Sequence, residues 1–170
     1  MSRREARERT FQLLYQLEIQ KSDRDEQIRA FLDQVTYAPL SKDLDFLPEE
    51  YPGDLARQVP NDEKQYIADA VTYISEHKES LDQCFKEFLV GWSVDRLPTV
   101  DLCIMRLATY EITRLPDIPF NVSVSEAVLL TKKYADSSSR PYINAVLGRL
   151  KQFSCAKEGA KDGKELSSDD

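Results

Sequence analysis

The stretch that decides the fold runs from Val94 to Thr113 and reads VDRLPTVDLCIMRLATYEIT. Pro98 stands where a helix can begin, because a residue in the first turn needs no N–H partner within the helix. Asp101 then falls in the first turn, where a carboxylate meets the positive end of the helix dipole. The stretch therefore predicts a helix that begins near Pro98.

The apolar residues of this helix cover more than one side. They recur at steps of three, one and four and form one broad stripe, made of Val100, Cys103, Ile104, Leu107, Ala108 and Ile112. Further apolar side chains lie off the stripe, at Leu102, Met105 and Tyr110. A helix of this kind usually has neighbours packed around it, so we expect it to be the centre of the core.

Helical spacing continues on both sides of the central helix. Three capping-box patterns, Ser-x-x-Glu or Ser-x-x-Gln, predict helix starts at Ser2, Ser80 and Ser123. Other helices are expected near 24–35, from Asn61 or Asp62 to about Ile74, and from the Ser137–Ser139 run to about Leu150. No convincing alternation of period two indicates a strand. The sequence predicts an all-α, single-domain bundle of about seven helices over residues 1–153.

Two segments do not fit the bundle. Residues 37–60 contain four prolines and a glycine among many carboxylates, which predicts a long acidic surface loop. Residues 154–170 are rich in Lys, Glu, Asp, Gly and Ser, too polar to pack, and are expected to form a disordered tail.

Composition is that of a soluble globular protein. The 170 residues are 41% hydrophobic and 31% charged. There is no apolar run of about twenty residues to span a membrane, and the charge from Arg3 onward is unlike a secretory signal. Cys84, Cys103 and Cys155 lack metal-ligand spacing and are expected to be free thiols in a reducing cytoplasm.

No motif for catalysis is present. The chain has no phosphate-cradling glycine loop, no nucleophile elbow and no metal-ligand spacing. Its single histidine, His77, falls at a predicted helix end without a nearby cysteine or acidic cluster. We therefore expect no enzyme activity and no cofactor.

The net charge of −7 argues against nucleic-acid binding, but its distribution weakens that objection. Residues 21–57 hold five cations against nine anions, a net of −4. Residues 131–151 hold five cations and one anion, a net of +4. The acidity is regional, so a local basic surface is possible.

The first predicted helix begins with four arginines, at Arg3, Arg4, Arg7 and Arg9. Arg4 and Arg9 each have a glutamate at four-residue spacing with which to pair. Arg3 and Arg7 have none, and both oppose the helix dipole, which suggests an external anion such as phosphate. Phe11 and Tyr15 continue the same row and offer stacking surfaces for single-stranded nucleic acid. The alternative is a solvated helix end with both rings in the core.

A second cluster lies near the other end of the chain. It combines cations, an aromatic ring and a serine-rich helix start, at Lys132, Lys133, Ser137–Ser139, Arg140, Tyr142 and Asn144. N–H groups and hydroxyls at a helix start can bind an anion, and Tyr142 offers a stacking face. The alternative is an ordinary capped helix whose tyrosine packs along the surface.

Three separated motifs resemble the bacterial transcription antitermination factor NusB family. They are SRREARERTFQLLYQLEI at the N-terminus, VDRLPTVDLCIMRLATYEI in the centre, and IPFNVSVSEAVLLTKKYADSSSRPYINAVLGRL toward the end. The resemblance covers roughly Ser2–Ile19 and Val94–Leu150, and 20–93 match only in helical pattern. It implies an all-helical domain that binds NusE, a small-subunit ribosomal protein. With NusE it would recognise single-stranded boxA RNA within an antitermination complex that supports transcription of rRNA operons.

The resemblance also implies roles for particular residues. Arg3, Arg4 and Arg7 would contact the RNA backbone, Tyr142 would contact a base, and Ser138 would lie near it. Tyr15 and Asp101 would lie at the side of NusE and the RNA.

Several departures from the family pattern leave a second function open. Glu5 interrupts the arginine run, Ser125 replaces the family's asparagine before Glu126, and Ala145 follows Asn144 where the family has glycine. Together with the acidic segment 37–60, these departures suggest an alternative: a protein-interaction scaffold that binds NusE but has lost strong RNA binding.

Overall fold

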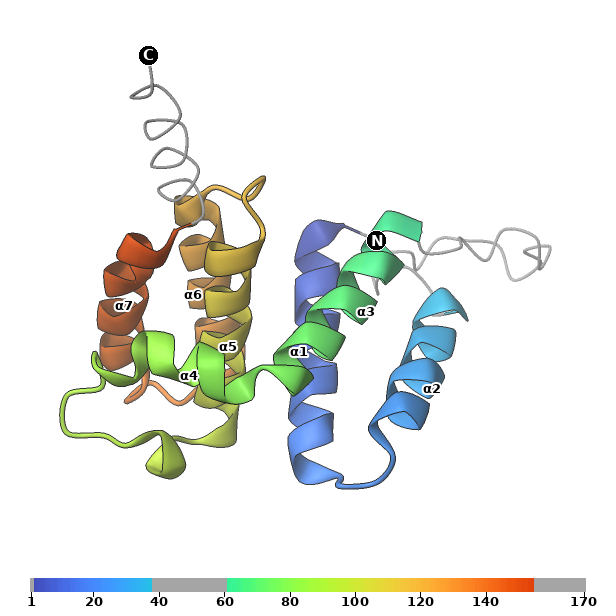
Figure 1. Cartoon of the computed structure of the whole chain (residues 1–170), viewed down its shortest axis with the longest axis horizontal. Coiled ribbons are helices and arrows are strands. Elements are labelled where there is room, and N and C mark those ends of the chain that lie inside the picture. The colour runs from blue at the N-terminus through green and yellow to red at the C-terminus, as the bar shows by residue number, and fades with distance from the viewer. Residues whose placement is uncertain (1, 38–60, 155–170) are drawn as a thin grey trace, which may run out of the picture. The chain divides into compact units, whose positions relative to one another are not determined.

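The computed structural model describes residues 2–37 and 61–154 (Figure 1). Helices account for most of these residues, and no strand occurs within the two described ranges. The all-α prediction is confirmed. Apart from Tyr37, which ends a helix, and Ser154, the expected acidic loop at 37–60 and tail at 154–170 lie outside the described residues. The chain consists of two compact units, and the boundary between them along the sequence falls between Thr72 and Tyr73.

The first unit contains α1 (Arg3–Ile19), α2 (Arg24–Tyr37) and most of α3 (Asn61–Glu76). The capping box predicted at the start of α1 is present. The Ser2 hydroxyl accepts a hydrogen bond from the Glu5 N–H, and a Glu5 carboxylate oxygen accepts one from the Ser2 N–H at 2.7 Å. The residues expected to face inward are buried, at Ala6, Thr10, Leu13 and Leu14, whereas Leu17 is only half-buried.

Gln27, on α2, holds the turn between α1 and α2. Its side chain is 8% exposed, and its amide nitrogen donates to the Gln20 carbonyl at 3.1 Å and to the Ser22 hydroxyl at 2.9 Å. Its amide oxygen accepts a hydrogen bond from Gln16 on α1 at 3.1 Å. A buried amide satisfied in this way stabilises one geometry of the turn.

The second unit is built around α5 (Thr99–Arg114), as the sequence predicts. Every residue from Cys103 to Ile112 is buried, including residues on and off the apolar stripe. Its neighbours are α4 (Lys78–Lys86), α6 (Phe120–Tyr134) and α7 (Arg140–Arg149), the last two of which are seen beside it in Figure 1. Short 3₁₀ helices cover Val94–Arg96 (η2) and Leu150–Phe153 (η3).

Polar side chains inside the second unit are satisfied by partners on other helices. Arg106 on α5 makes two hydrogen bonds of 2.8 Å to the two carboxylate oxygens of Asp82 on α4. The Ser123 hydroxyl on α6 donates to Glu111 on α5 at 3.0 Å, where both residues are buried. Among the described residues, no buried side-chain polar atom lacks a hydrogen-bond partner.

Two of the three predicted capping boxes are wrong. α4 begins at Lys78, directly after α3, so Ser80 lies inside the helix and His77 is its N-cap residue. α6 begins at Phe120 with Pro119 as its N-cap residue, and Ser123 binds Glu111 instead of the backbone. In both cases the pattern lies one turn inside a helix that starts earlier, so its serine is free to bond elsewhere.

The remaining helix limits agree closely with expectation. α5 begins after Pro98 and ends before Pro116, and α7 begins after Ser139. The apolar residues Ile143, Val146 and Leu147 of α7 are buried, and so is Leu150 at the start of η3. Cys103 is a buried free thiol and Cys84 a half-buried one, while Cys155 lies outside the described residues.

The described ranges contain neither a membrane-spanning helix nor a cluster of metal ligands. None of the helices there is both long and apolar enough to cross a membrane. In the same ranges, no group of three or more His, Cys, Asp or Glu side chains is placed to hold a metal ion.

Candidate nucleic-acid interface

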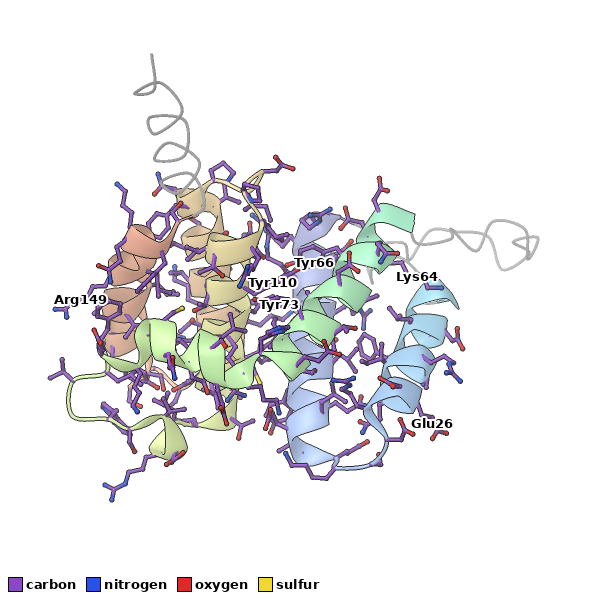
Figure 2. All side chains as sticks on the ribbon, viewed as in Figure 1. Glu26, Lys64, Tyr66, Tyr73, Tyr110 and Arg149 are labelled. Carbon is purple, nitrogen blue, oxygen red and sulfur yellow. The ribbon has the colours of Figure 1, made fainter. Side chains whose placement is uncertain are left out.

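The prediction that Arg3 lacks a partner is wrong. Its Nε donates to a carboxylate oxygen of Glu63 on α3 at 2.8 Å, and its guanidinium lies 4.5 Å from the centroid of the Tyr66 ring, which is labelled in Figure 2. Glu63 is sixty residues away in the chain, so the i,i+4 rule used to search for partners could not find it. Because the Arg3 side chain is 40% exposed, part of the guanidinium still faces water.

The other predicted arginines differ in exposure. Arg4 is exposed and Arg7 is only 6% exposed, and both side chains interact with other groups of the protein. Arg9 donates to the side-chain oxygen of Gln12 at 3.5 Å, whereas Glu5 is engaged in the capping box. Of the three arginines proposed to contact RNA, Arg4 is therefore the one whose charge is most accessible.

The aromatic row of α1 is part core and part surface. Phe11 is 2% exposed, whereas Tyr15, one turn later, is 39% exposed. Their ring centroids are 6.5 Å apart. The core interpretation is right for Phe11 and wrong for Tyr15, and Tyr15 presents an aromatic surface to water, as the interface prediction requires.

In the second unit, Tyr142 is held in place by its hydroxyl group. The half-buried side chain on α7 donates a short hydrogen bond to the Asp101 carboxylate in the first turn of α5. Asp101 is 1% exposed, so its carboxylate is covered by the protein and acts on the tyrosine. This contact brings together two residues, 41 positions apart, that were each predicted separately as site residues.

Trp92 stacks on the Tyr142 ring. The two ring centroids are 5.7 Å apart and the planes are inclined by 23°. Trp92 is 48% exposed and lies in the segment between α4 and η2. Trp92 was not among the predicted site residues, although a tryptophan directly after a glycine is a signal that could have identified it.

The serines before α7 are not equivalent. Ser138 is exposed, and its N–H donates to the Asp136 carboxylate at 3.2 Å. The Ser137 hydroxyl donates to the same oxygen at 3.3 Å, whereas Ser139 is 4% exposed. Two donors of the serine-rich turn, the Ser137 hydroxyl and the Ser138 N–H, are thus already bound to the Asp136 carboxylate.

The cations of this region are at the surface. Arg140 donates to the backbone carbonyl of Lys132 at 3.2 Å, which places the start of α7 beside the end of α6. Lys132, Lys133 and Arg140 are all exposed, and the Lys133 ammonium lies 5.5 Å from the Tyr134 ring centroid. Asn144 is also exposed. Arg140 therefore supplies positive charge two residues before Tyr142 on α7, and the two lysines add charge at the end of α6.

The environment of Asp101 predicts a pH dependence. Burial raises the pKa of this carboxyl, a hydrogen bond with Ser139 lowers it, and the charge of Asp136 raises it, with a net upward shift. Between the unfolded and folded pKa values, the folded protein holds a proton that the unfolded chain releases. Stability from this group is therefore gained as the pH falls through that window, and lost as it rises.

We expect the wild type to gain melting temperature relative to Asp101→Asn as the pH falls from about 7 to about 4, the range above the ordinary Asp pKa. Asp95→Asn removes an exposed carboxylate of the same unit and controls for the change in net charge. If the melting temperatures of wild type and Asp101→Asn change by the same amount across this pH range, the upward shift of the Asp101 pKa is contradicted.

Comparison with known proteins gives the family. The model of the NusB family matches residues 4–152. The chain is 37% identical to the transcription antitermination protein NusB of Acetivibrio thermocellus over 150 residues, which cover 88% of each chain. It is 34% identical to that of Ruminiclostridium cellulolyticum over 158 residues, or 93% of this chain and 94% of the relative.

Solved structures agree with the sequence comparison. The structure of T. maritima NusB superposes with a TM-score of 0.71 at 26% identity and covers 95% of this chain and 98% of that one. A chain from a crystal structure of the antitermination factors NusB and NusE in complex with dsRNA shares the fold, with a TM-score of 0.66 at 22% identity. That match covers 88% of this chain and 96% of the other. On the family match and the two curated relatives, this chain belongs to the NusB family.

Proposed function

We propose that the chain is a cytoplasmic transcription antitermination factor without enzymatic activity, which binds single-stranded boxA-type RNA together with NusE. The observation that carries this proposal is the family match over residues 4–152, with curated relatives named transcription antitermination proteins. A protein of the same fold has been crystallised with NusE and RNA. By this proposal, the chain supports transcription of rRNA operons as part of an antitermination complex.

The proposed RNA contacts come from both units. In the first unit, Arg3, Arg4 and Arg7 contact phosphates, and Tyr15 lies at the side of RNA and NusE. In the second unit the contacts are made by Tyr142 and Ser138, with Asp101 assigned to the NusE side. The burial of Asp101 favours an indirect role, in which its carboxylate orients the Tyr142 ring.

The proposed RNA-binding domain covers residues 1–153. Arg4 is exposed at the beginning of α1, where a phosphate would be drawn by the helix dipole as well as by the guanidinium. The Tyr142 hydroxyl is already used and Trp92 stacks on one side of the ring, so the part of the ring that Trp92 leaves uncovered is what Tyr142 offers to RNA. This arrangement separates a charge contact from a stacking contact.

The two kinds of contact predict different losses. Arg4→Ala should weaken binding to all RNAs alike and flatten the log–log salt dependence by about 0.7, the single-strand value for one phosphate. Tyr142→Ala should leave that slope nearly unchanged and cost about 1–3 kcal/mol through lost stacking. A salt titration of each variant by fluorescence anisotropy, with NusE present, measures both quantities. Tyr142→Phe keeps the ring and removes only the hydroxyl, so it should bind more tightly than Tyr142→Ala.

If Arg4→Ala leaves the slope of the salt dependence unchanged, Arg4 at the start of α1 does not contact a phosphate. A slope lowered as much by Tyr142→Ala as by Arg4→Ala would contradict the stacking role of Tyr142.

The scaffold function is a second candidate, favoured by specific contacts. Arg3 is paired with Glu63 and Asp136 closes the serine turn, so two elements suited to bind phosphate are partly occupied by carboxylates of the chain itself. A scaffold would bind NusE normally, without preference among RNAs.

A further inference from the structure

The turn after α4 presents a tryptophan at the surface. Trp92 is 48% exposed and Val90 is 80% exposed. Gly91, between them, has a φ of 78°, a conformation that other residues rarely adopt. Backbone hydrogen bonds from Val90 to Phe88 and from Trp92 to Leu89 close the turn around it. The backbone therefore places the indole in a defined position even though half of it faces water.

One side of the Trp92 indole is supported by Tyr142. The rings are near-parallel, and Tyr142 is itself fixed by its hydrogen bond to the buried Asp101 carboxylate. Trp92 thus rests on a ring that cannot turn away without breaking a buried contact. A preorganised aromatic pair loses little conformational freedom when a ligand stacks on it.

The chemistry around this pair suits a nucleobase better than an apolar protein segment. Arg140 lies two residues before Tyr142 on α7, is exposed, and is held against the end of α6 by its bond to the Lys132 carbonyl. Lys132 and Lys133, at the end of α6, are also exposed. An exposed aromatic pair with an exposed arginine in the same helix turn can bind single-stranded nucleic acid, with stacking for the base and charge for the phosphate.

We propose that Trp92 is a further RNA-stacking residue, on whose exposed part an unpaired base stacks while Tyr142 supports the indole from its other side. The inference rests on the proposed RNA-binding function and adds a contact to it. Because stacking is tolerant of base identity, Trp92 contributes to affinity more than to sequence choice.

Trp92 is the only tryptophan of the chain, so its fluorescence reports this position directly. Two RNAs of the same length, a boxA-type strand and an abasic strand, are each titrated into the full chain. A tryptophan-free NusE variant is present in both titrations. We expect saturable quenching by the RNA with bases and little by the abasic strand, which carries the same phosphate charge. Equal quenching by the two strands, or none by either while anisotropy shows binding, would overturn the proposal.

Variants separate stacking from support of Tyr142. Trp92→Phe keeps an aromatic face and should bind RNA nearly as wild type. Trp92→Ala and Trp92→Leu should each weaken binding by roughly 5- to 150-fold, which corresponds to the ~1–3 kcal/mol of one stacked base. Leu still packs on the tyrosine, so Leu behaving as Phe would show that Trp92 only supports Tyr142. Val90→Ala, in the same turn, is the matched control and should bind as wild type.

Two further measurements keep the outcomes distinct. NusE binding and the melting temperature of each variant show whether the fold survives; if Trp92→Ala unfolds, the comparison of Phe with Leu still decides. If wild-type protein with NusE fails to bind boxA RNA at all, both the proposed function and the proposed Trp92 contact are wrong. If wild type binds and Trp92→Leu binds equally well, only the stacking role of Trp92 is wrong.

Discussion

Leu107→Asp is expected to unfold the second unit. Leu107 is 2% exposed in the middle of α5, within a run of buried residues from Cys103 to Ile112. A carboxylate at this position loses its hydration without gaining a hydrogen-bond or ion-pair partner, and the apolar contacts of the leucine are lost as well. We expect a loss of at least ~4 kcal/mol, which is a large part of the ~5–15 kcal/mol that stabilises a typical domain.

The measurement is chemical denaturation followed by circular dichroism. Leu129→Asp makes the same chemical change on α6 at a leucine that is 41% exposed, and it should change stability by only about 0.5 kcal/mol. Similar denaturation midpoints for the two variants would show that α5 is not the centre of its unit.

The ion pair between α4 and α5 predicts the second large effect. Arg106 binds both carboxylate oxygens of Asp82 at 2.8 Å, and the two side chains are only 9% and 14% exposed. Arg106→Met would leave the largely buried Asp82 carboxylate without its guanidinium. We expect a loss of about 3 kcal/mol, at the low end of the range for broken buried pairs, because Asp82 keeps some access to water.

Removing both charges should recover much of that loss. The double variant Asp82→Leu with Arg106→Met leaves no charge to be desolvated, so it should be more stable than Arg106→Met alone. Lys21→Met is the exposed control, since the Lys21–Glu18 pair is 3.5 Å long with the lysine 70% exposed, and it should cost less than ~1 kcal/mol. If Arg106→Met costs no more than Lys21→Met, the pair contributes nothing to joining the two helices.

Local patterns predicted the helices well. The stripe of α5 and its start after Pro98 depend on residues within a few turns of one another, and both were correct. The Ser2–Glu5 capping box was also correct. The same pattern failed at Ser123 because α6 begins earlier, at Phe120, and the serine inside the helix binds Glu111, a partner twelve residues earlier that no local rule identifies.

The candidate site was predicted less completely, for the same physical reason. The partners of Arg3 and Tyr142 are Glu63 and Asp101, distant in the sequence and brought near by packing. Charge counting therefore treated Arg3 as available when a carboxylate already binds it. Trp92 was missed because its role depends on the ring beneath it, and that ring belongs to another helix.

The proposed function is tested most directly by one titration. Labelled boxA-type RNA and a scrambled RNA of equal length and composition are each titrated with the full chain, with and without NusE, and followed by anisotropy at fixed salt. The NusB-family assignment and the exposed Arg4, Tyr15 and Trp92 side chains predict saturable, sequence-dependent binding that NusE strengthens. By reciprocity, boxA RNA should tighten NusE binding by the same factor. Equal, weak binding of both RNAs in the presence of bound NusE would contradict RNA recognition and establish the scaffold function instead.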